Sequence, residues 1–201
     1  VATGVFHEKV TFPRSGTAAA PITLMAAPGA APVLAGVGAT GCNMVLIDGR
    51  SYVQVVGFEI RNNLAVSDCS GVRVLGSGDG VVIRGNTIHD IRGTDAMAIT
   101  VYGTDTLPIS GLVIDRNVVY DCEPSQSEAI TLNGNVTGFL VEGNLVRDVN
   151  NIGIDFIGGE GSIQPDPTLV ARNGICRGNT VLRAHSNYGG GFAGGIYVDG
   201  G

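Results

Sequence analysis

The chain has 201 residues, which suits one domain with one continuous core, and no apolar run approaches the length of a membrane-spanning helix. Hydrophobic residues make up 44% of the chain and aromatic residues only 5%, so the expected core is built from Val, Ile and Leu in buried strands. A net charge of −6 disfavours nucleic acid as a partner, and we expect neither nucleic-acid nor membrane binding.

A strand motif that alternates apolar and variable residues and closes on glycine recurs along the chain. Its copies are Met44–Gly49, Gly71–Gly76, Ala98–Gly103, Ala129–Gly134, Gly153–Gly158 and Gly195–Gly200. The closing glycines are 24 to 31 residues apart in the first five copies and 42 apart before the last. The alternation predicts strands with one face in the core.

A second motif lies between these copies. It occurs as Val55–Asn62, Val82–Asp90, Val113–Asp121, Leu140–Asp148 and Ile175–Arg183. One position of it holds Phe58 in the first copy and then Asn86, Asn117, Asn144 and Asn179. Short strands without a helix-length amphipathic segment, repeated about every 27 residues, predict a right-handed parallel β-helix of about six coils, and not a βαβ fold or a propeller. Stacked coils would place these asparagines roughly 4.8 Å apart in a hydrogen-bonded structural column.

The cysteines follow the same repeat. Cys42 and Cys69 each lie seven residues before a closing glycine, so they are expected on adjacent coils at a separation that allows a disulfide. The spacing leaves open whether they are bonded. Cys122 and Cys176 align with core positions and are expected to be buried.

The outward positions of the first strand motif form two predicted columns on one sheet face. One holds Arg73, Thr100, Thr131, Asp155 and Tyr197, and the next holds Leu75, Tyr102, Asn133, Ile157 and Asp199. Such a face suits an extended sugar chain, although it is equally the pattern of an ordinary solvated sheet. The long connections 159–174 and 184–194 flank the strands of Asp155 and Tyr197, so we expect the site at this end.

Segments near both ends of the chain carry a family resemblance. Gly4–Val10, Pro21–Leu24, Pro32–Gly36, Asn150–Gly161 and Ala171–Thr180 resemble secreted right-handed β-helix proteins of the pectate-lyase-like superfamily. The resemblance is greatest to polysaccharide lyases of the chondroitinase B, alginate lyase and family-nine pectate lyase type, and to uncharacterised members. It implies a secreted or periplasmic protein with a polysaccharide partner. The family-nine enzymes resemble one another in a calcium-binding aspartate cluster and a lysine base. This chain has no aspartate pair in the matching strands and no lysine beyond Lys9.

The resemblance implies a polysaccharide lyase that cleaves a uronate-containing polysaccharide by β-elimination. That reaction needs a group that neutralises the substrate carboxylate, a base and a proton donor. Arg172, or Ca²⁺ held by Asp155, Glu128 and Asp95, would neutralise the carboxylate. The catalytic candidates are Asp155, Arg172, His185 and Tyr197. The substrate-binding candidates are Arg73, Tyr102, Thr131, Asn133, Tyr188 and Asp199.

Two other functions stay open. One is a non-catalytic glycan-binding, adhesin or structural β-helix, which would show a uniformly solvated face. The other is a glycoside hydrolase that uses paired carboxylates, such as Asp155 and Asp199.

The ends of the chain read as parts of coils. Val1–Gly4 enters midway through a motif, and Ile196–Gly201 forms a core strand with nothing after it. We therefore expect residues 1–201 to be one domain within a longer solenoid, or to associate end to end through uncovered coils.

Overall fold

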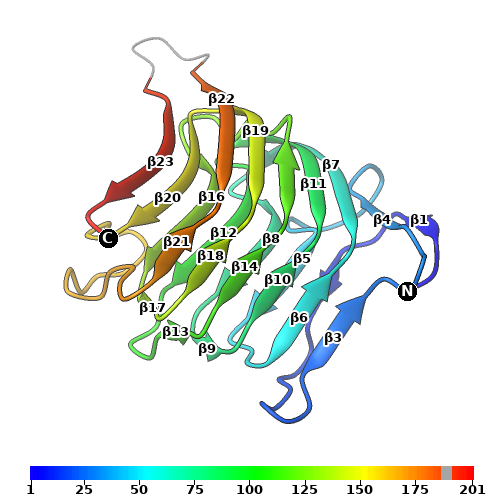
Figure 1. Ribbon diagram of the computed structural model, residues 1–201, viewed down its shortest axis with the longest axis horizontal. Helices are drawn as coiled ribbons and strands as arrows, with labels where there is room; N and C mark the ends of the chain where they lie inside the picture. The colour runs from blue at the N-terminus through cyan, green and yellow to red at the C-terminus, as the bar shows by residue number, and fades with distance from the viewer. Residues whose placement is uncertain (187–191) are drawn as a thin grey trace.

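The computed structural model describes residues 1–186 and 192–201, without the side chain of Ala65. The described chain is all β, and its strands stack in parallel as a right-handed parallel β-helix. The coils follow one another along a single axis from the N-terminal to the C-terminal end (Figure 1). No described helix is long and apolar enough to cross a membrane.

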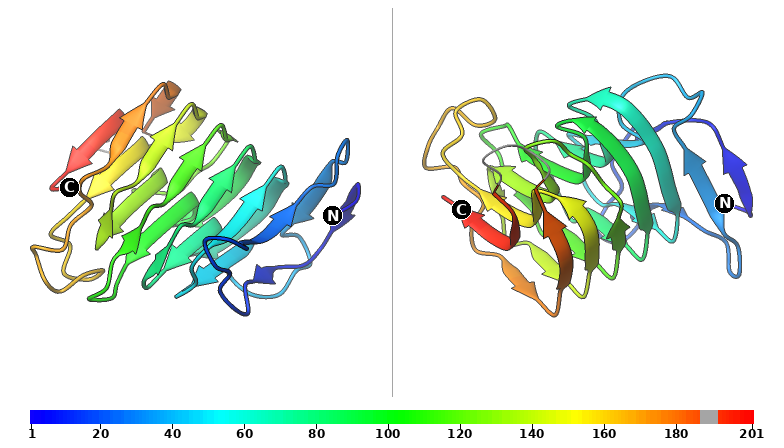
Figure 2. Two further views of the ribbon diagram at one scale, coloured as in Figure 1. Left: turned by 60° about the horizontal axis from the view of Figure 1, so that its bottom comes forward. Right: turned by 90° about the horizontal axis from the view of Figure 1, so that it is seen from above.

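Three long parallel sheets form the sides of the solenoid, and each coil contributes a strand to each side (Figure 2). The β7 sheet contains, in spatial order, β1 (Gly4–Phe6), β4 (Pro32–Ala35), β7 (Glu59–Ser67), β11 (Thr87–Thr94), β15 (Val118–Tyr120), β19 (Leu145–Asn150) and β22 (Thr180–His185). The β10 sheet contains β3 (Ile22–Met25), β6 (Val53–Val56), β10 (Val82–Arg84), β14 (Val113–Asp115), β18 (Leu140–Glu142) and β21 (Ile175–Arg177).

The β12 sheet carries the first sequence motif. It contains β2 (Val10–Thr11), β5 (Val45–Asp48), β8 (Ser70–Leu75), β12 (Met97–Gly103), β16 (Glu128–Gly134), β20 (Ile152–Ile157) and β23 (Gly194–Asp199). A short fourth sheet at one corner contains β9 (Gly78–Asp79), β13 (Ile109–Ser110) and β17 (Val136–Thr137).

The core is a set of apolar columns along the axis. Ile99 is in register with Val72 and Ile130, and Ile130 is in register with Ile154. All four side chains are fully buried. Burying each such side chain stabilises the fold by about 1.5–3 kcal/mol, so the repeat of apolar positions drives the stacking.

An asparagine column occupies the corner between the β10 and β7 sheets. The side-chain amide of Asn86 donates to Oδ1 of Asn117, that of Asn117 to Oδ1 of Asn144, and that of Asn144 to Oδ1 of Asn179, at 2.9 to 3.1 Å. Each amide also donates to a backbone carbonyl of the preceding coil, as Asn117 does to Ile83. The backbone N–H of Phe58 donates to Oδ1 of Asn86 and so begins the column.

The residue before each asparagine of this column has a left-handed backbone. Gly85, Gly143 and Gly178 take φ values of 62 to 65°, where glycine has no steric penalty. Arg116 stands at the equivalent position in the coil between Gly85 and Gly143, with φ 53°. This coil therefore carries a local backbone cost that its neighbours avoid.

Two of the cysteines are bonded and two are free. Cys42 and Cys69 form a disulfide between adjacent coils with their Cα atoms 5.2 Å apart. Cys122 is buried as expected, but Cys176 is exposed. The expectation for Cys176 was wrong because it lies in the last described coil, where no further coil covers it.

The last coil also exposes residues of the apolar interior. Ile196 is 48% and Val198 60% exposed. A hollow of about 360 Å³ opens at this end between Phe139, Phe156 and these two side chains. End-to-end association through this surface stays a prediction.

Candidate functional site

The outer face of the β12 sheet has the predicted register. Thr100 is paired with Arg73 and Thr131, Asp155 with Thr131, and Tyr197 with Asp155. In the second column, Tyr102 is paired with Leu75 and Asn133, and Asn133 with Ile157. Asp199 ends β23 directly after the pair Phe156–Val198. The predicted glycan-facing residues of this sheet therefore do share one surface.

Most of this face is less solvated than its outward position suggested. Thr131 is fully buried, and Asp155 and Asn133 are only 1% and 2% exposed. Tyr102 lies beside Asn133 on the neighbouring strand, and Glu128 interacts with Thr131 and Asp155. Tyr197 is exposed and touches Phe192, with ring centroids 5.2 Å apart. The face is thus a partly buried polar layer, and the alternative of an ordinary solvated sheet does not describe its centre.

Arg73 and Tyr102 are engaged with partners at the N-terminal part of the face. The Arg73 guanidinium is paired with Asp68 at 2.6 Å and lies 5.2 Å from the centroid of the Tyr102 ring. Nε of Arg73 also donates to the Ser70 hydroxyl. Burial raises the pKa of the Tyr102 phenol above its ordinary value. These contacts hold Arg73 in place and use two of its five guanidinium N–H donors.

Four carboxyl groups gather toward the C-terminal part of the face. Burial, reinforced by the charge of Asp155, raises the pKa of Glu128 to about 8. Burial also raises the pKa of Asp155 to about 6, and the negative charges of Asp199 and Glu160 add to this effect. At neutral pH, Glu128 is therefore mostly protonated and Asp155 mostly ionised. A neutral carboxylic acid and a carboxylate then lie on neighbouring strands.

Glu160 reaches this face from the connection after β20. Its carboxylate Oε2 accepts a hydrogen bond from the Asn133 amide at 2.6 Å. The same connection is fastened by Gln164, whose amide donates to the carbonyls of Thr104 and Asp105. The long loop predicted to flank the site is thus held against the end of the β12 sheet.

Three buried oxygens of this face have no hydrogen-bond partner among the described residues. They are Oγ1 of Thr131, Oδ1 of Asn133 and Oδ1 of Asp155. Buried polar atoms in folded proteins are nearly always satisfied by protein, water or ligand, so water or a ligand group is expected beside these atoms.

The other predicted catalytic residues lie elsewhere in the coil. The Arg172 guanidinium donates to Oδ1 of Asn135 and to the Val170 carbonyl, at the corner beside β17. His185 ends β22 and is exposed, with Nδ1 3.1 Å from the Arg183 carbonyl. Tyr188 falls outside the described residues. Among the described residues, neither the Arg172 nor the His185 side chain forms a hydrogen bond or an ion pair with Asp155.

The predicted calcium ligands do not form a set. Asp95 accepts a hydrogen bond from the Ser127 hydroxyl at 2.7 Å, whereas Glu128 and Asp155 influence each other electrostatically. Within residues 1–186 and 192–201, no three His, Cys, Asp or Glu side chains are close enough to hold a metal ion. The described side chains therefore offer no set of three carboxylate ligands, and calcium binding stays a prediction.

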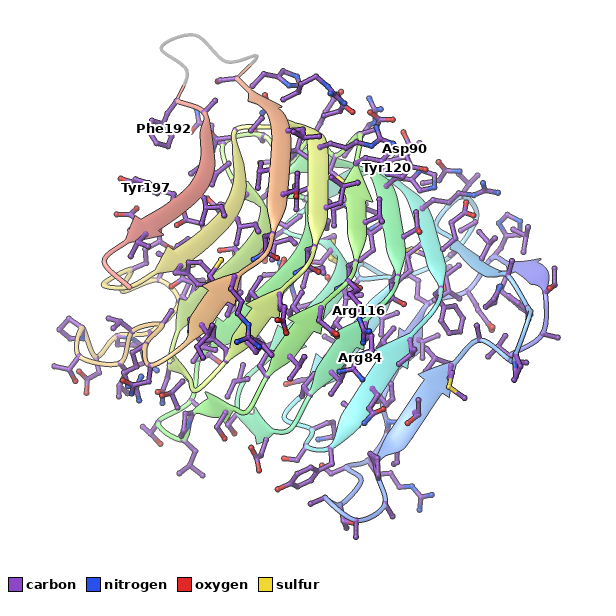
Figure 3. All side chains as sticks on the ribbon, in the orientation of Figure 1. Arg84, Asp90, Arg116, Tyr120, Phe192 and Tyr197 are labelled. Carbon is purple, nitrogen blue, oxygen red and sulfur yellow. A yellow bond between two sulfur atoms is a disulfide. The ribbon has the colours of Figure 1, made fainter. Side chains whose placement is uncertain are left out.

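On the outer face of the β7 sheet, aromatic and charged side chains stack on one another. The His89 and Tyr120 rings are parallel with centroids 4.6 Å apart, and the Arg147 guanidinium lies 4.3 Å from the Tyr120 centroid. His89 also contacts the carboxylates of Asp90 and Glu59. Figure 3 shows Asp90 and Tyr120 together on this side, away from Tyr197 on β23 and from Phe192, which precedes that strand. Since both faces of the Tyr120 ring are covered, this stack serves stability.

Comparison with known proteins supports no assigned activity. The chain matches no protein-family profile. It is 36% identical over 216 aligned positions to the uncharacterized protein YwoF of Bacillus subtilis (strain 168), and the match takes in 98% of this chain but 45% of that protein. The chain therefore spans less than half the length of this relative.

Two solved structures are similar in outline. Pectate lyase Pel9A has a TM-score of 0.40 at 11% identity, over 92% of this chain and 67% of that one. The PL6 family polysaccharide lyase Pedsa3628 from Pseudopedobacter saltans has a TM-score of 0.21 at 16% identity, over 94% and 76% of the two chains. The stacking of the parallel strands by itself establishes a parallel β-helix.

Proposed function

We propose that the chain is a carbohydrate-active β-helix that binds an extended glycan along the outer face of the β12 sheet and hydrolyses a glycosidic bond there. The observation that carries this proposal is the pair of unmatched carboxyl groups, Glu128 and Asp155, on adjacent strands β16 and β20. Environments that separate the pKa values of two neighbouring carboxyl groups suit one to act as acid and the other as base.

In this reaction Glu128 donates its proton to the glycosidic oxygen as the bond to the anomeric carbon breaks. Asp155 accepts a proton from the water that attacks this carbon. Its Oδ1 has no partner among the described residues but is buried, so the side chains that cover it have to move when the glycan binds. The attacking water supplies the new hydroxyl group, and the two carboxyl groups exchange protonation states before the next turnover. Tyr197, in register with Asp155 and exposed, provides an aromatic surface for a neighbouring sugar.

The second candidate is β-elimination on a uronate polysaccharide, with Asp155 as the base. The observation in its favour is Tyr197 beside Asp155, because a phenol can protonate the leaving oxygen. Its weakness is the lack of a group that neutralises the substrate carboxylate, because the Arg172 guanidinium donates to Asn135 and Val170. Calcium stays an expectation, which a chelator arm of the assay below tests.

The location of the protein belongs to the same proposal. A disulfide between Cys42 and Cys69 persists in oxidising compartments and is rare in reducing ones. This bond, together with the sequence resemblance to secreted proteins, supports secretion to the cell exterior or the periplasm.

The test is a panel of neutral, amino and uronate polysaccharides, assayed for new reducing ends and for unsaturated uronate absorbance, with and without EDTA. We expect reducing ends without the absorbance, and a loss of roughly 100-fold or more in Glu128→Gln, the range of a lost general acid. Glu142→Gln is the matched control, because Glu142 lies on the β10 sheet and pairs with Arg177. Equal activity of both variants would remove Glu128 from the mechanism, and no turnover on any glycan would favour a binding or structural role.

A further inference from the structure

The carboxyl groups around the proposed cleavage site lack a cation of their own. Among the ion pairs of the described residues, none includes Glu128, Asp155, Glu160 or Asp199. Arg73 on the same face is already paired with Asp68. Positive charge is therefore the missing component of this surface.

Asn133 shows what kind of group is missing. Its amide donates to Glu160, which turns the donor side of the side chain toward that carboxylate. Its Oδ1 has no hydrogen-bond donor, although the side chain is 2% exposed. Oδ1 of Asp155 is buried and unpartnered in the same way. Both atoms are acceptors, so the partner that they lack is a donor, whereas the unpartnered hydroxyl of Thr131 beside Asp155 can donate or accept.

We propose that Asn133 and Glu160 bind a protonated amino group of the glycan, so that the substrate is a polysaccharide with unacetylated amino sugars. An ammonium group has three N–H donors and no acceptor, so it can satisfy Oδ1 of Asn133 and the Glu160 carboxylate together. A uronate would bring acceptors and negative charge to a place that already has both. The inference rests on the proposed function, because it assigns the sugar next to Glu128 and Asp155.

Binding of matched oligosaccharides by calorimetry tests this assignment. The probes are oligomers of glucosamine, N-acetylglucosamine and glucose with the same linkage, and an oligogalacturonate. We expect the glucosamine oligomer to bind about tenfold more tightly than the glucose oligomer, as one charged hydrogen bond would give. Glu160→Gln should remove this preference while keeping the size of the side chain.

The matched control is Asp166→Asn, in the same connection and with the same change in net charge. The Asp166 carboxylate accepts hydrogen bonds from the backbone and hydroxyl of Thr168, away from Asn133. We expect this variant to keep the preference. If Asp166→Asn loses it equally, or Glu160→Gln keeps it, general attraction to an acidic protein explains the binding and the assignment is wrong.

Failure of this inference can be told apart from failure of the proposed function. Equal affinity for glucosamine and glucose oligomers, together with Glu128-dependent cleavage, would overturn the amino-sugar assignment and leave hydrolysis standing. A preference that depends on Glu160, without any cleavage, would support the amine site and overturn hydrolysis. Tightest binding of the oligogalacturonate would overturn the assignment.

Discussion

At the scale of single residues, the site depends on two carboxyl groups whose surroundings oppose ionisation. The sequence placed Asp155 on the outward column and Glu128 at the start of its strand, but it could not show that both are shielded from water. Glu128 was predicted as a metal ligand, and its proposed role is now that of an acid. The connection 159–174 was expected to flank the site, but the hydrogen bond from Asn133 to Glu160 could not be predicted, because it depends on how this connection folds.

The pH dependence of turnover follows from these two groups. Activity needs Asp155 ionised and Glu128 protonated, with pKa values of about 6 and about 8. We expect a bell-shaped profile of kcat/KM with its maximum between these values. A rate that keeps rising above pH 9 would contradict the assignment of Glu128 as the acid.

Glu128 should also make the stability of the fold fall with increasing pH. Its pKa is raised from an ordinary 4.5 to about 8 in the folded chain, so between these values the folded state holds a proton that the unfolded state has lost. The stabilisation is complete below the lower value and lost as the pH rises through the upper one, with a slope of up to about 1.4 kcal/mol per pH unit. Glu128→Gln should flatten this part of the curve in urea unfolding, whereas an unchanged slope would show that Glu128 is not shifted.

At the scale of elements, the repeat predicted the strands, their register and the positions of the asparagines. The copies could be aligned because each coil closes on the same turn residues. The burial of the outer face was missed because period-two alternation assigns every second residue to solvent, whether or not longer neighbours cover it. The exposure of Cys176 was missed because alignment with core positions does not show whether a following coil covers the residue.

The asparagine column should be cooperative. Asn117→Leu removes an amide that accepts from Asn86 and donates to Asn144 and to the Ile83 carbonyl. We expect destabilisation by roughly 1–3 kcal/mol, because buried partners on both neighbouring coils lose a hydrogen bond. Denaturant unfolding measures it, with Arg177→Leu on the exposed surface as control. A loss no larger than that of the control would contradict a structural role.

Replacing Arg116, unlike replacing Asn117, is not expected to destabilise the fold. It adopts φ 53° at the turn position where Gly85 and Gly143 stand in the adjacent coils. Arg116→Gly should relieve left-handed strain of roughly 1 kcal/mol, offset in part by the freedom of glycine in the unfolded chain. The net result expected from thermal unfolding is unchanged or higher stability, and the reverse change Gly143→Arg should destabilise. Lower stability of Arg116→Gly would mean that the Arg116–Asp115 ion pair outweighs the strain.

At the scale of the whole molecule, the sequence predicted the architecture and left the reaction open. A parallel β-helix places one residue of every coil on the same line, so its sides are easily inferred from spacing. The chemistry depends on which column of residues is buried from water and carries charges without an ion-pair partner. Neither property can be read from the spacing of the repeat. The β7 sheet has its charges paired, whereas the β12 sheet gathers unpaired carboxyl groups around Asp155.

The most direct test of the account is cleavage of a glycan by the 201-residue chain in water enriched in oxygen-18, followed by mass spectrometry of the products. Hydrolysis at Glu128 and Asp155 predicts one heavy oxygen atom in each new pair of ends, and no incorporation above background in Glu128→Gln. Products that carry an unsaturated sugar and no heavy oxygen would contradict hydrolysis and establish elimination in its place.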